Sequence, residues 1–200
     1  MARAGWIPPQ QRTLLPEWAV GPRAPKTTGG LRDLDPMARV LATTDGTVTE
    51  ILEAWADEPI EIGYLDQELA ELGGPIDALE IGPPFSVLRR EIVLRGARTG
   101  EALLHAESLI AIDRLPRSIV DGLLLHRTPI GRLLRASRLE TYREILQLEM
   151  EAAGLFAGRL GRPPDELLVS RTYRVIAGGL PVMLIHERFP RRLARIPTRA

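Results

Sequence analysis

Polar and apolar residues alternate with a period of two along residues 87–95, which predicts a β-strand with one apolar and one solvated face. Arg90 falls on the apolar face, between Leu88 and Ile92. A buried guanidinium is costly unless a carboxylate or phosphate binds it, whether from the protein or from a ligand. Arg90 is therefore a candidate anion-binding residue, with an internal salt bridge as the alternative.

The remaining segments alternate irregularly between helical and strand patterns. Asp35-Pro36 and Thr47 are typical helix starts, and Glu50 stands at the third helical position of a capping box. Two further helices are predicted to begin at Pro116 and Thr128-Pro129, and a longer amphipathic helix is predicted over residues 139–156. Strands are predicted over residues 60–65, 87–95, 101–113, 167–176 and 181–188, with a Gly- and Pro-rich loop or flap over residues 68–84.

Short glycine-containing turns, Arg98-Thr99-Gly100 and Gly178-Gly179, join two pairs of predicted strands and favour antiparallel pairing. Because the elements show no regular βαβ alternation, the chain is predicted to be an α+β domain around an antiparallel sheet. This domain covers residues 35–190. Residues 1–34 are proline-rich and predict an extended arm, anchored by Trp6 and Trp18, and residues 191–200 predict a solvated basic tail.

Composition narrows the class of function. Lys and Arg total 26, as do Asp and Glu, so no net field attracts nucleic acid or a membrane surface. The chain has no cysteine, which excludes disulfides, thiolate chemistry and cysteine metal sites. The three histidines lack metal-ligand spacing. With no apolar run of membrane-spanning length and no apolar core of the signal-peptide type, a cytoplasmic location is expected.

Two further positions could carry chemistry. Glu187 alternates with apolar residues in the last predicted strand, and a carboxyl group in such surroundings can donate or accept a proton near neutral pH. Alternatively, Glu187 neutralises Arg90 across the sheet, and a ligand could also lie between the two. The helix that follows Thr128-Pro129 starts with backbone amides that lack an internal acceptor, and Gly131 allows a carboxylate to approach them closely.

Several of these segments resemble the chorismate pyruvate-lyase (4-hydroxybenzoate synthase) family. The resemblance covers about residues 35–190 and implies a six-stranded antiparallel sheet flanked by helices, with a ligand enclosed beneath helical flaps. It also implies conversion of chorismate to 4-hydroxybenzoate and pyruvate without a metal or organic cofactor. The matching motifs are Arg90-Glu91-Ile92-Val93-Leu94, the run from Ala106 to Pro116, Thr128-Pro129-Ile130-Gly131, the run from Tyr173 to Gly179, Pro181-Val182-Met183 and Glu187.

By motif position, the resemblance implies a role for four residues. Arg90 and the backbone amide of Ile130 are expected to bind the ring carboxylate. Glu187 is expected at the 4-hydroxyl end of the ring, where the backbone carbonyl of Val48 faces the same hydroxyl. A second cation should meet the enolpyruvyl carboxylate, and Arg174 and Arg171 are the candidates.

The sequence departs from the best-known family pattern at two positions, because Val48 replaces a methionine and Glu107 replaces an arginine. These departures and the N-terminal arm leave open an enzyme that acts on another cyclic substrate. A non-catalytic small-molecule-binding module is a further alternative, since effector domains of bacterial regulators share this fold class. The chain lacks the basic recognition helix that a DNA-binding regulator would need.

Overall fold

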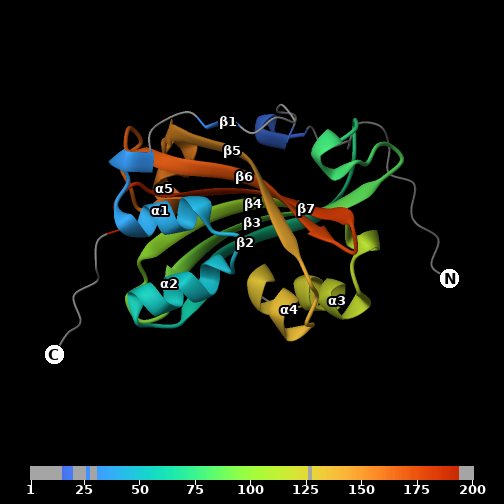
Figure 1. The fold of residues 1–200 in the computed structure, drawn as a ribbon, viewed down its shortest axis with the longest axis horizontal. Coiled ribbons are helices and arrows are strands. Elements are labelled where there is room, and N and C mark those ends of the chain that lie inside the picture. Colours follow the sequence, from blue (N-terminus) through green and yellow to red (C-terminus); the bar gives the residue numbers. More distant parts are fainter. Residues whose placement is uncertain (1–14, 20–25, 28–30, 126–127, 194–200) are drawn as a thin grey trace.

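One twisted sheet organises the protein in this computed structural model, which describes residues 15–19, 26–27, 31–125 and 128–193 (Figure 1). The strand order is β1-β5-β6-β7-β4-β3-β2. The two-residue β1 joins β5 in parallel at one edge, and the other six strands pair antiparallel, as predicted. The strands are β1 (Lys26–Thr27), β2 (Ile60–Glu71), β3 (Ser86–Gly96), β4 (Ala102–Ile110), β5 (Tyr142–Ala152), β6 (Leu167–Ala177) and β7 (Leu180–Pro190).

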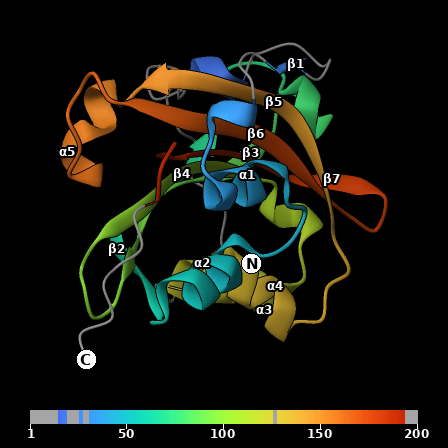
Figure 2. The same cartoon turned by 60° about the vertical axis from the view of Figure 1, so that its left-hand side comes forward.

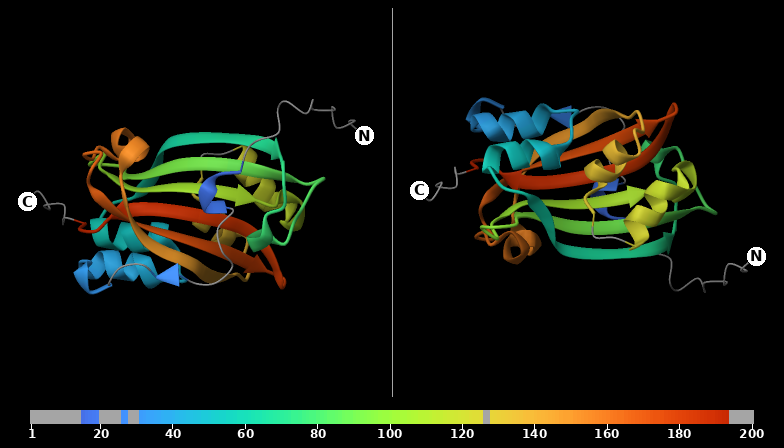
Figure 3. Two further views of the ribbon diagram at one scale, coloured as in Figure 1. Left: turned by 90° about the horizontal axis from the view of Figure 1, so that it is seen from above. Right: turned by 90° about the horizontal axis from the view of Figure 1, so that it is seen from below.

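The four longer helices cover one face of this sheet, and short elements lie on the other (Figures 2 and 3). The covering helices are α1 (Pro36–Thr43), α2 (Val48–Ala56), α3 (Arg117–Leu125) and α4 (Ile130–Ala136). The opposite face carries the short helix α5 (Ala157–Leu160) and three 3₁₀ helices, labelled η: η2 (Glu17–Ala19), η4 (Asp77–Leu79) and η6 (Gly154–Phe156). Two further 3₁₀ helices, η3 (Leu31–Asp33) and η5 (Ile112–Arg114), form connecting turns. No described helix has both the length and the apolar character to cross a membrane.

The helix starts agree with the sequence in part. Asp35 caps α1, because its Oδ1 accepts a hydrogen bond from the Ala38 amide at 2.6 Å. The capping box predicted for α2 is wrong, because the Thr47 side chain makes no capping hydrogen bond and Glu50 forms an ion pair with Arg135 on α4. At the start of α4 the N-cap residue is Pro129 and not the preceding Thr128.

The helix predicted over residues 139–156 is wrong, because most of this segment is strand β5. Its pairing with β6 shifts register between Ile145 and Gln147, so a bulge interrupts the alternation that identifies a strand. Strand β2 is also longer than predicted and includes residues 68–71 of the expected loop. The other predicted strands are confirmed to within a few residues.

Apolar side chains form separate clusters on the two faces. On the helix-covered face, one cluster packs α1 and α2 against the sheet and another packs α3 and α4. A third cluster lies on the opposite face beneath η2 and η4, where the ring of Trp18 stacks on His186 at 5.4 Å. The anchoring predicted for Trp18 is therefore present, whereas Trp6 lies outside the described residues. The domain boundaries at residues 34/35 and 190/191 stay a prediction.

Glu58 connects the end of α2 to the turn between β3 and β4. Its buried carboxylate accepts hydrogen bonds from the amides of Arg98 and Thr99, at 2.6 and 3.0 Å, and from the Thr99 hydroxyl at 2.7 Å. A Cβ on Gly96 would overlap this carboxylate, so a glycine is needed there. Burial opposes ionisation of Glu58, but the hydrogen bonds from Thr99 and Arg98 outweigh it and lower the pKa of the carboxyl group.

We expect Glu58→Gln to lower the free energy of unfolding by about 1–3 kcal/mol at pH 7, because an amide cannot accept all three hydrogen bonds. Since the pKa of Glu58 is lower in the folded state, its stabilisation is present above the unfolded-state pKa and is lost as the pH falls. Urea denaturation at several pH values measures both effects. Glu61→Gln, which removes an exposed ion pair with Arg95, is the matched control. Equal stability of the two variants at pH 7 would contradict this role.

Candidate functional site

A pocket opens between the starts of α2 and α4 and the helix-covered face of the sheet. Its cavity volume is about 50 Å³, within about 560 Å³ of empty space that includes open solvent. Its walls are mainly apolar, which suits a small cyclic ligand. The lining residues are Thr47, Val48 and Thr49 from α2 and its cap, Pro129, Ile130, Gly131 and Leu134 from α4 and its cap, and Ile92, Leu94, Leu104, Ala106, Ser108, Arg143, Tyr173, Val175, Ile185 and Glu187 from the strands.

The two helix starts contact each other above the sheet. A Cβ on Gly131 would lie 2.4 Å from Cγ2 of Thr47, so only glycine lets α4 approach this closely. Ion pairs between α2 and α4, Glu50 with Arg135 and Glu53 with Arg132, hold the helices together. The structure thus brings together Val48 and Ile130, which are far apart in the sequence and were both predicted to contact the ligand.

Glu187 supplies the carboxylate of the pocket, and two buried residues of β6 donate to it. The Arg171 Nε donates to Oε2 at 2.7 Å, and the Tyr173 hydroxyl donates to Oε1 at 2.9 Å. Glu187 shares its strand face with Ile185, as expected, but these two donors make its immediate surroundings polar. The expected neutralisation of Arg90 is wrong, because the ion-pair partner of Glu187 is Arg171 and β4 separates the strands of Glu187 and Arg90.

Electrostatic interactions keep Arg171 positively charged and the Tyr173 hydroxyl protonated, so both can donate hydrogen bonds to Glu187. Burial disfavours a charged Arg171, but the adjacent Glu187 carboxylate outweighs it and raises the pKa of the guanidinium. Burial, with the negative charge of Glu187, raises the pKa of the Tyr173 hydroxyl far above neutral. The Arg171 Nη1 also donates to the carbonyl of Thr44 at 3.0 Å, which fixes the turn before α2 to the sheet.

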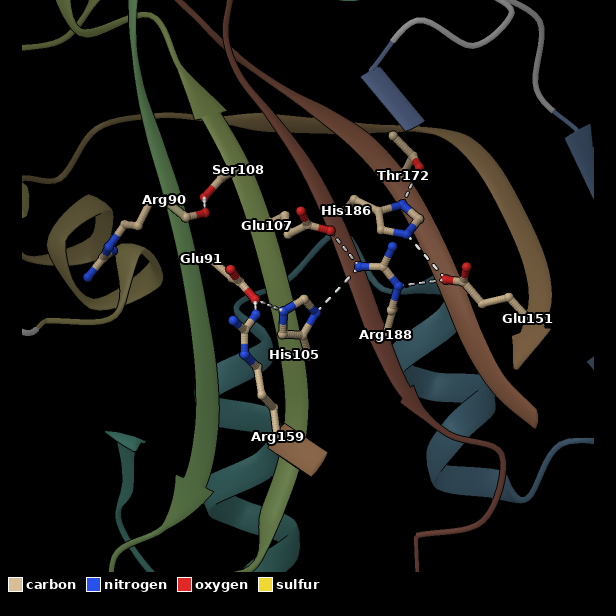
Figure 4. A network of polar contacts seen from close by, with 10 residues as sticks. All are labelled: Arg90, Glu91, His105, Glu107, Ser108, Glu151, Arg159, Thr172, His186 and Arg188. Carbon is tan, nitrogen blue, oxygen red and sulfur yellow. Dashed lines mark hydrogen bonds and ion pairs between the residues drawn. The ribbon is translucent and has the colours of Figure 1, made fainter. Parts of the chain in front are cut away.

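Arg90 lies on the same face of the sheet, at the other side of the pocket. Its side chain is 1% exposed, and its Nη2 donates to the carbonyl of Thr128 at 2.9 Å, two residues before Ile130. Figure 4 shows the side chain pointing toward the helices, away from the side on which Glu91 lies. The predicted burial of Arg90 on an apolar strand face is confirmed. Its neighbours Ile92 and Ser108, rather than Arg90 itself, line the pocket.

The structure corrects the prediction for Arg174. Tyr173 faces the pocket, so Arg174 points to the opposite face of the sheet. There its Nε binds Glu144 at 2.6 Å and its Nη1 binds Glu80 at 3.3 Å. The alternative candidate, Arg171, is on the pocket side.

Sequence reasoning missed Arg143, which lies on β5 and lines the pocket. The side chain is half-buried, and its Nη1 donates to the carbonyl of Asp45 at 2.6 Å. It was missed because this segment was assigned to a helix. Recognition of a strand beginning at Tyr142 would have drawn attention to this arginine.

Glu107 takes no part in the pocket. It belongs to a charged network on the opposite face, where Arg188 binds both Glu107 and Glu151 (Figure 4). His105 donates from Nε2 to Glu91 at 2.7 Å as a neutral imidazole, because burial, and then the charge of Arg188, lowers its pKa to about 3. Within the described residues, no group of three or more acidic or histidine side chains is arranged to hold a metal ion.

Comparisons with known proteins show the family to which the chain is similar. The family model described as "Chorismate pyruvate-lyase Rv2949c-like" matches residues 42–197. A chorismate pyruvate-lyase of Mycobacterium leprae (strain TN) is 37% identical over 162 residues, which are 80% of this chain and 77% of the relative. A chorismate pyruvate-lyase of Mycobacterium tuberculosis (strain CDC 1551 / Oshkosh) is 32% identical over 170 residues, which are 82% of this chain and 85% of the relative.

Among solved structures, the effector domain of PhnF from Mycobacterium smegmatis is similar with a TM-score of 0.55 and 15% identity. The match covers 74% of this chain and 90% of that domain. At this identity the likeness concerns the fold alone. It confirms the α+β class with an antiparallel sheet.

We expect Arg171→Met to lower the free energy of unfolding by about 3–5 kcal/mol, because it leaves the buried Glu187 carboxylate without its cation. Arg174→Met, on the opposite face of the same strand, removes partly exposed ion pairs and should cost about 0–1 kcal/mol. Urea denaturation of the two variants measures the difference. Similar losses for both would mean that Arg171 is not the cation that stabilises Glu187.

Proposed function

Because the chain belongs to the Rv2949c-like chorismate pyruvate-lyase family, we propose that it converts chorismate to 4-hydroxybenzoate and pyruvate. This is the reaction of a carbon–oxygen lyase. The observation that carries the proposal is a pocket that combines apolar walls with the Glu187 carboxylate and the Arg143 guanidinium, while the buried Arg90 lies next to it beside the start of α4. No metal or organic cofactor enters the proposal.

The reaction depends more on correct positioning of the substrate than on strong acid or base catalysis. Chorismate is a dianion with a cyclohexadiene ring and an enolpyruvyl ether. Breaking the bond between the ring and the ether oxygen, with loss of the proton on the hydroxyl-bearing ring carbon, makes the ring aromatic. The step is therefore strongly downhill, and orientation with charge stabilisation can supply most of the rate enhancement.

In this proposal Arg90 and the backbone amide of Ile130 bind the ring carboxylate. The contact of Arg90 with the carbonyl of Thr128 supports this, because it places the guanidinium beside the start of α4. A guanidinium and an amide in one place offer two charge-assisted hydrogen bonds.

Glu187 binds the 4-hydroxyl of the ring, and the backbone carbonyl of Val48 faces the same group. Each carboxylate oxygen of Glu187 already accepts one hydrogen bond, from Arg171 or Tyr173, and retains capacity for another donor. The substrate hydroxyl is such a donor. General acid–base assistance typically supplies about 10²–10⁴ in rate, so Glu187 need not carry the whole acceleration.

The partners and the location of the protein belong to the same proposal. Chorismate is the substrate and 4-hydroxybenzoate the product, with no nucleic-acid or membrane partner. The absence of cysteine is compatible with a reducing compartment, and we place the enzyme in the cytoplasm. Ligand binding without turnover, or turnover of a different cyclic acid only, would instead indicate a binding module or an enzyme of another pathway.

We expect the purified protein alone to form 4-hydroxybenzoate and pyruvate in equal amounts from chorismate. Pyruvate can be followed by coupled reduction to lactate, and 4-hydroxybenzoate by chromatography of the same reaction. Absence of both products at high enzyme concentration would refute the proposed function.

Arg90→Met should lower kcat/KM by about 30-fold or more, because it removes a buried charge-assisted contact with the ring carboxylate. Steady-state kinetics with chorismate measures the change. The matched control is Arg89→Met, since Arg89 is the neighbouring residue on the solvent face and pairs with Asp66 and Glu68. Normal kcat/KM in a folded Arg90→Met variant would show that Arg90 does not bind the substrate.

A further inference from the structure

We propose that Arg143 binds the carboxylate of the enolpyruvyl side chain and so distinguishes the dianionic substrate from the monoanionic product. The inference rests on the proposed function and adds a specificity-determining residue to it. Arg143 lines the pocket, and no side chain of the described part of the chain neutralises its charge.

The contacts of Arg143 set it apart from the two arginines of β6. Arg171 forms an ion pair with Glu187, and Arg174 forms ion pairs on the opposite face. Arg143 contacts only a backbone carbonyl, that of Asp45, and forms no ion pair with a carboxylate among the described residues. A half-buried guanidinium in an apolar pocket is a ready site for an anionic ligand group.

The strand order places Arg143 beyond Glu187 when viewed from Arg90. Arg90 lies on β3 and Arg143 on β5, and β7, the strand that carries Glu187, lies midway between these two strands (Figure 1). Along the strands, Glu187 is level with Ile92 of β3, two residues beyond Arg90. The four inter-strand steps between the two arginines correspond to about 19 Å between their backbones, at roughly 4.8 Å per step. Long side chains on these two strands can therefore approach a bound ring from its two sides.

The turn before α2 brings the guanidinium of Arg143 toward the Glu187 end of the pocket. Arg171 donates to the carbonyl of Thr44, and Arg143 donates to the next carbonyl along the chain, that of Asp45. Contacts to consecutive carbonyls place the two guanidinium groups close together. Their positive charges both act on the Tyr173 hydroxyl, where they oppose the effect of burial on its pKa.

The shape of the substrate matches this arrangement. In chorismate the ring carboxylate and the hydroxyl lie at opposite ends of the ring, and the enolpyruvyl ether is attached next to the hydroxyl-bearing carbon. With Arg90 on the ring carboxylate and Glu187 on the hydroxyl, the second carboxylate falls near Glu187 and away from Arg90. Within the described residues, Arg143 is the pocket-lining cation at that end that forms no ion pair, whereas Arg171 is paired with Glu187.

The contact has a consequence for product release. When the ether bond breaks, the second carboxylate departs with pyruvate, so 4-hydroxybenzoate keeps no group that can reach Arg143. The energy of this ion pair therefore favours the substrate and not the product. Arg90, in contrast, binds a carboxylate that substrate and product share.

The test compares two ligands in one variant. Arg143→Met should raise KM for chorismate by about 10-fold or more, as expected for loss of a hydrogen-bonded charge pair. The Kd of 4-hydroxybenzoate, measured by calorimetry, should stay within about twofold, because the product makes no ion pair with Arg143. Arg143→Lys keeps the charge and should raise KM less than Arg143→Met does. Arg174→Met, on the opposite face of the sheet, is the control and should change neither constant.

Two results would overturn this role for Arg143. If it only holds the turn through Asp45, the displaced Val48 would weaken both ligands, and KM and Kd would rise together. An unchanged KM in a folded Arg143→Met variant, or in Arg143→Gln should the methionine variant not fold, would also overturn it. Product formation by the unmodified enzyme tests the proposed function separately, so failure of one is distinguishable from failure of the other.

Discussion

The guanidinium of Arg171 is 1% exposed, and burying it removes nearly all of its hydration. Such a group is tolerated only where well-placed acceptors replace lost water, and here Glu187 accepts from Nε and the carbonyl of Thr44 accepts from Nη1, while Nη2 has no hydrogen-bond partner among the described residues. The first contact joins β6 to β7 beneath the pocket, and the second joins the sheet to the turn before α2. Tyr173 donates to the other oxygen of Glu187. The carboxylate and the helix start that carries Val48 are therefore both positioned by one side chain.

Most of the fold follows from local patterns that the sequence displays. Strands β3, β6 and β7 alternate regularly, and glycine-containing turns join β3 to β4 and β6 to β7. Strand β5 was not predictable in this way, because its bulge places apolar residues at 145, 146, 148 and 150. Separations of three and four residues within this set imitate a helix. Ile145 and Leu148 pack on the helix-covered face, whereas Leu146 packs in the cluster on the opposite face.

The candidate site was predictable where one face of a strand is clearly apolar. Arg90 met that condition, and the structure buries it beside the start of α4. Strand β6 did not meet this condition, because both of its faces carry polar and apolar residues. Alternation alone therefore could not show whether Arg171 or Arg174 faces the pocket. The opposite face holds a charged network around Arg188, which is a long-range arrangement of side chains from β3, β4, β5 and β7 (Figure 4). The resemblance to a family located Val48 and Ile130, but it gave no information on Arg143.

The turn between α1 and α2 is held to the sheet through main-chain oxygens, those of Thr44 and Asp45. Every amino acid has such an oxygen, so replacing either side chain leaves the grip of the two arginines in place. The contacts with the arginines therefore place no demand on the identity of either residue, although the Oγ1 of Thr44 also accepts a hydrogen bond from the Gly46 amide at 2.9 Å. The number of residues in the turn is constrained, because inserting or deleting one residue would move both carbonyls out of register with the arginines. For these two contacts, the length of the loop matters more than its composition.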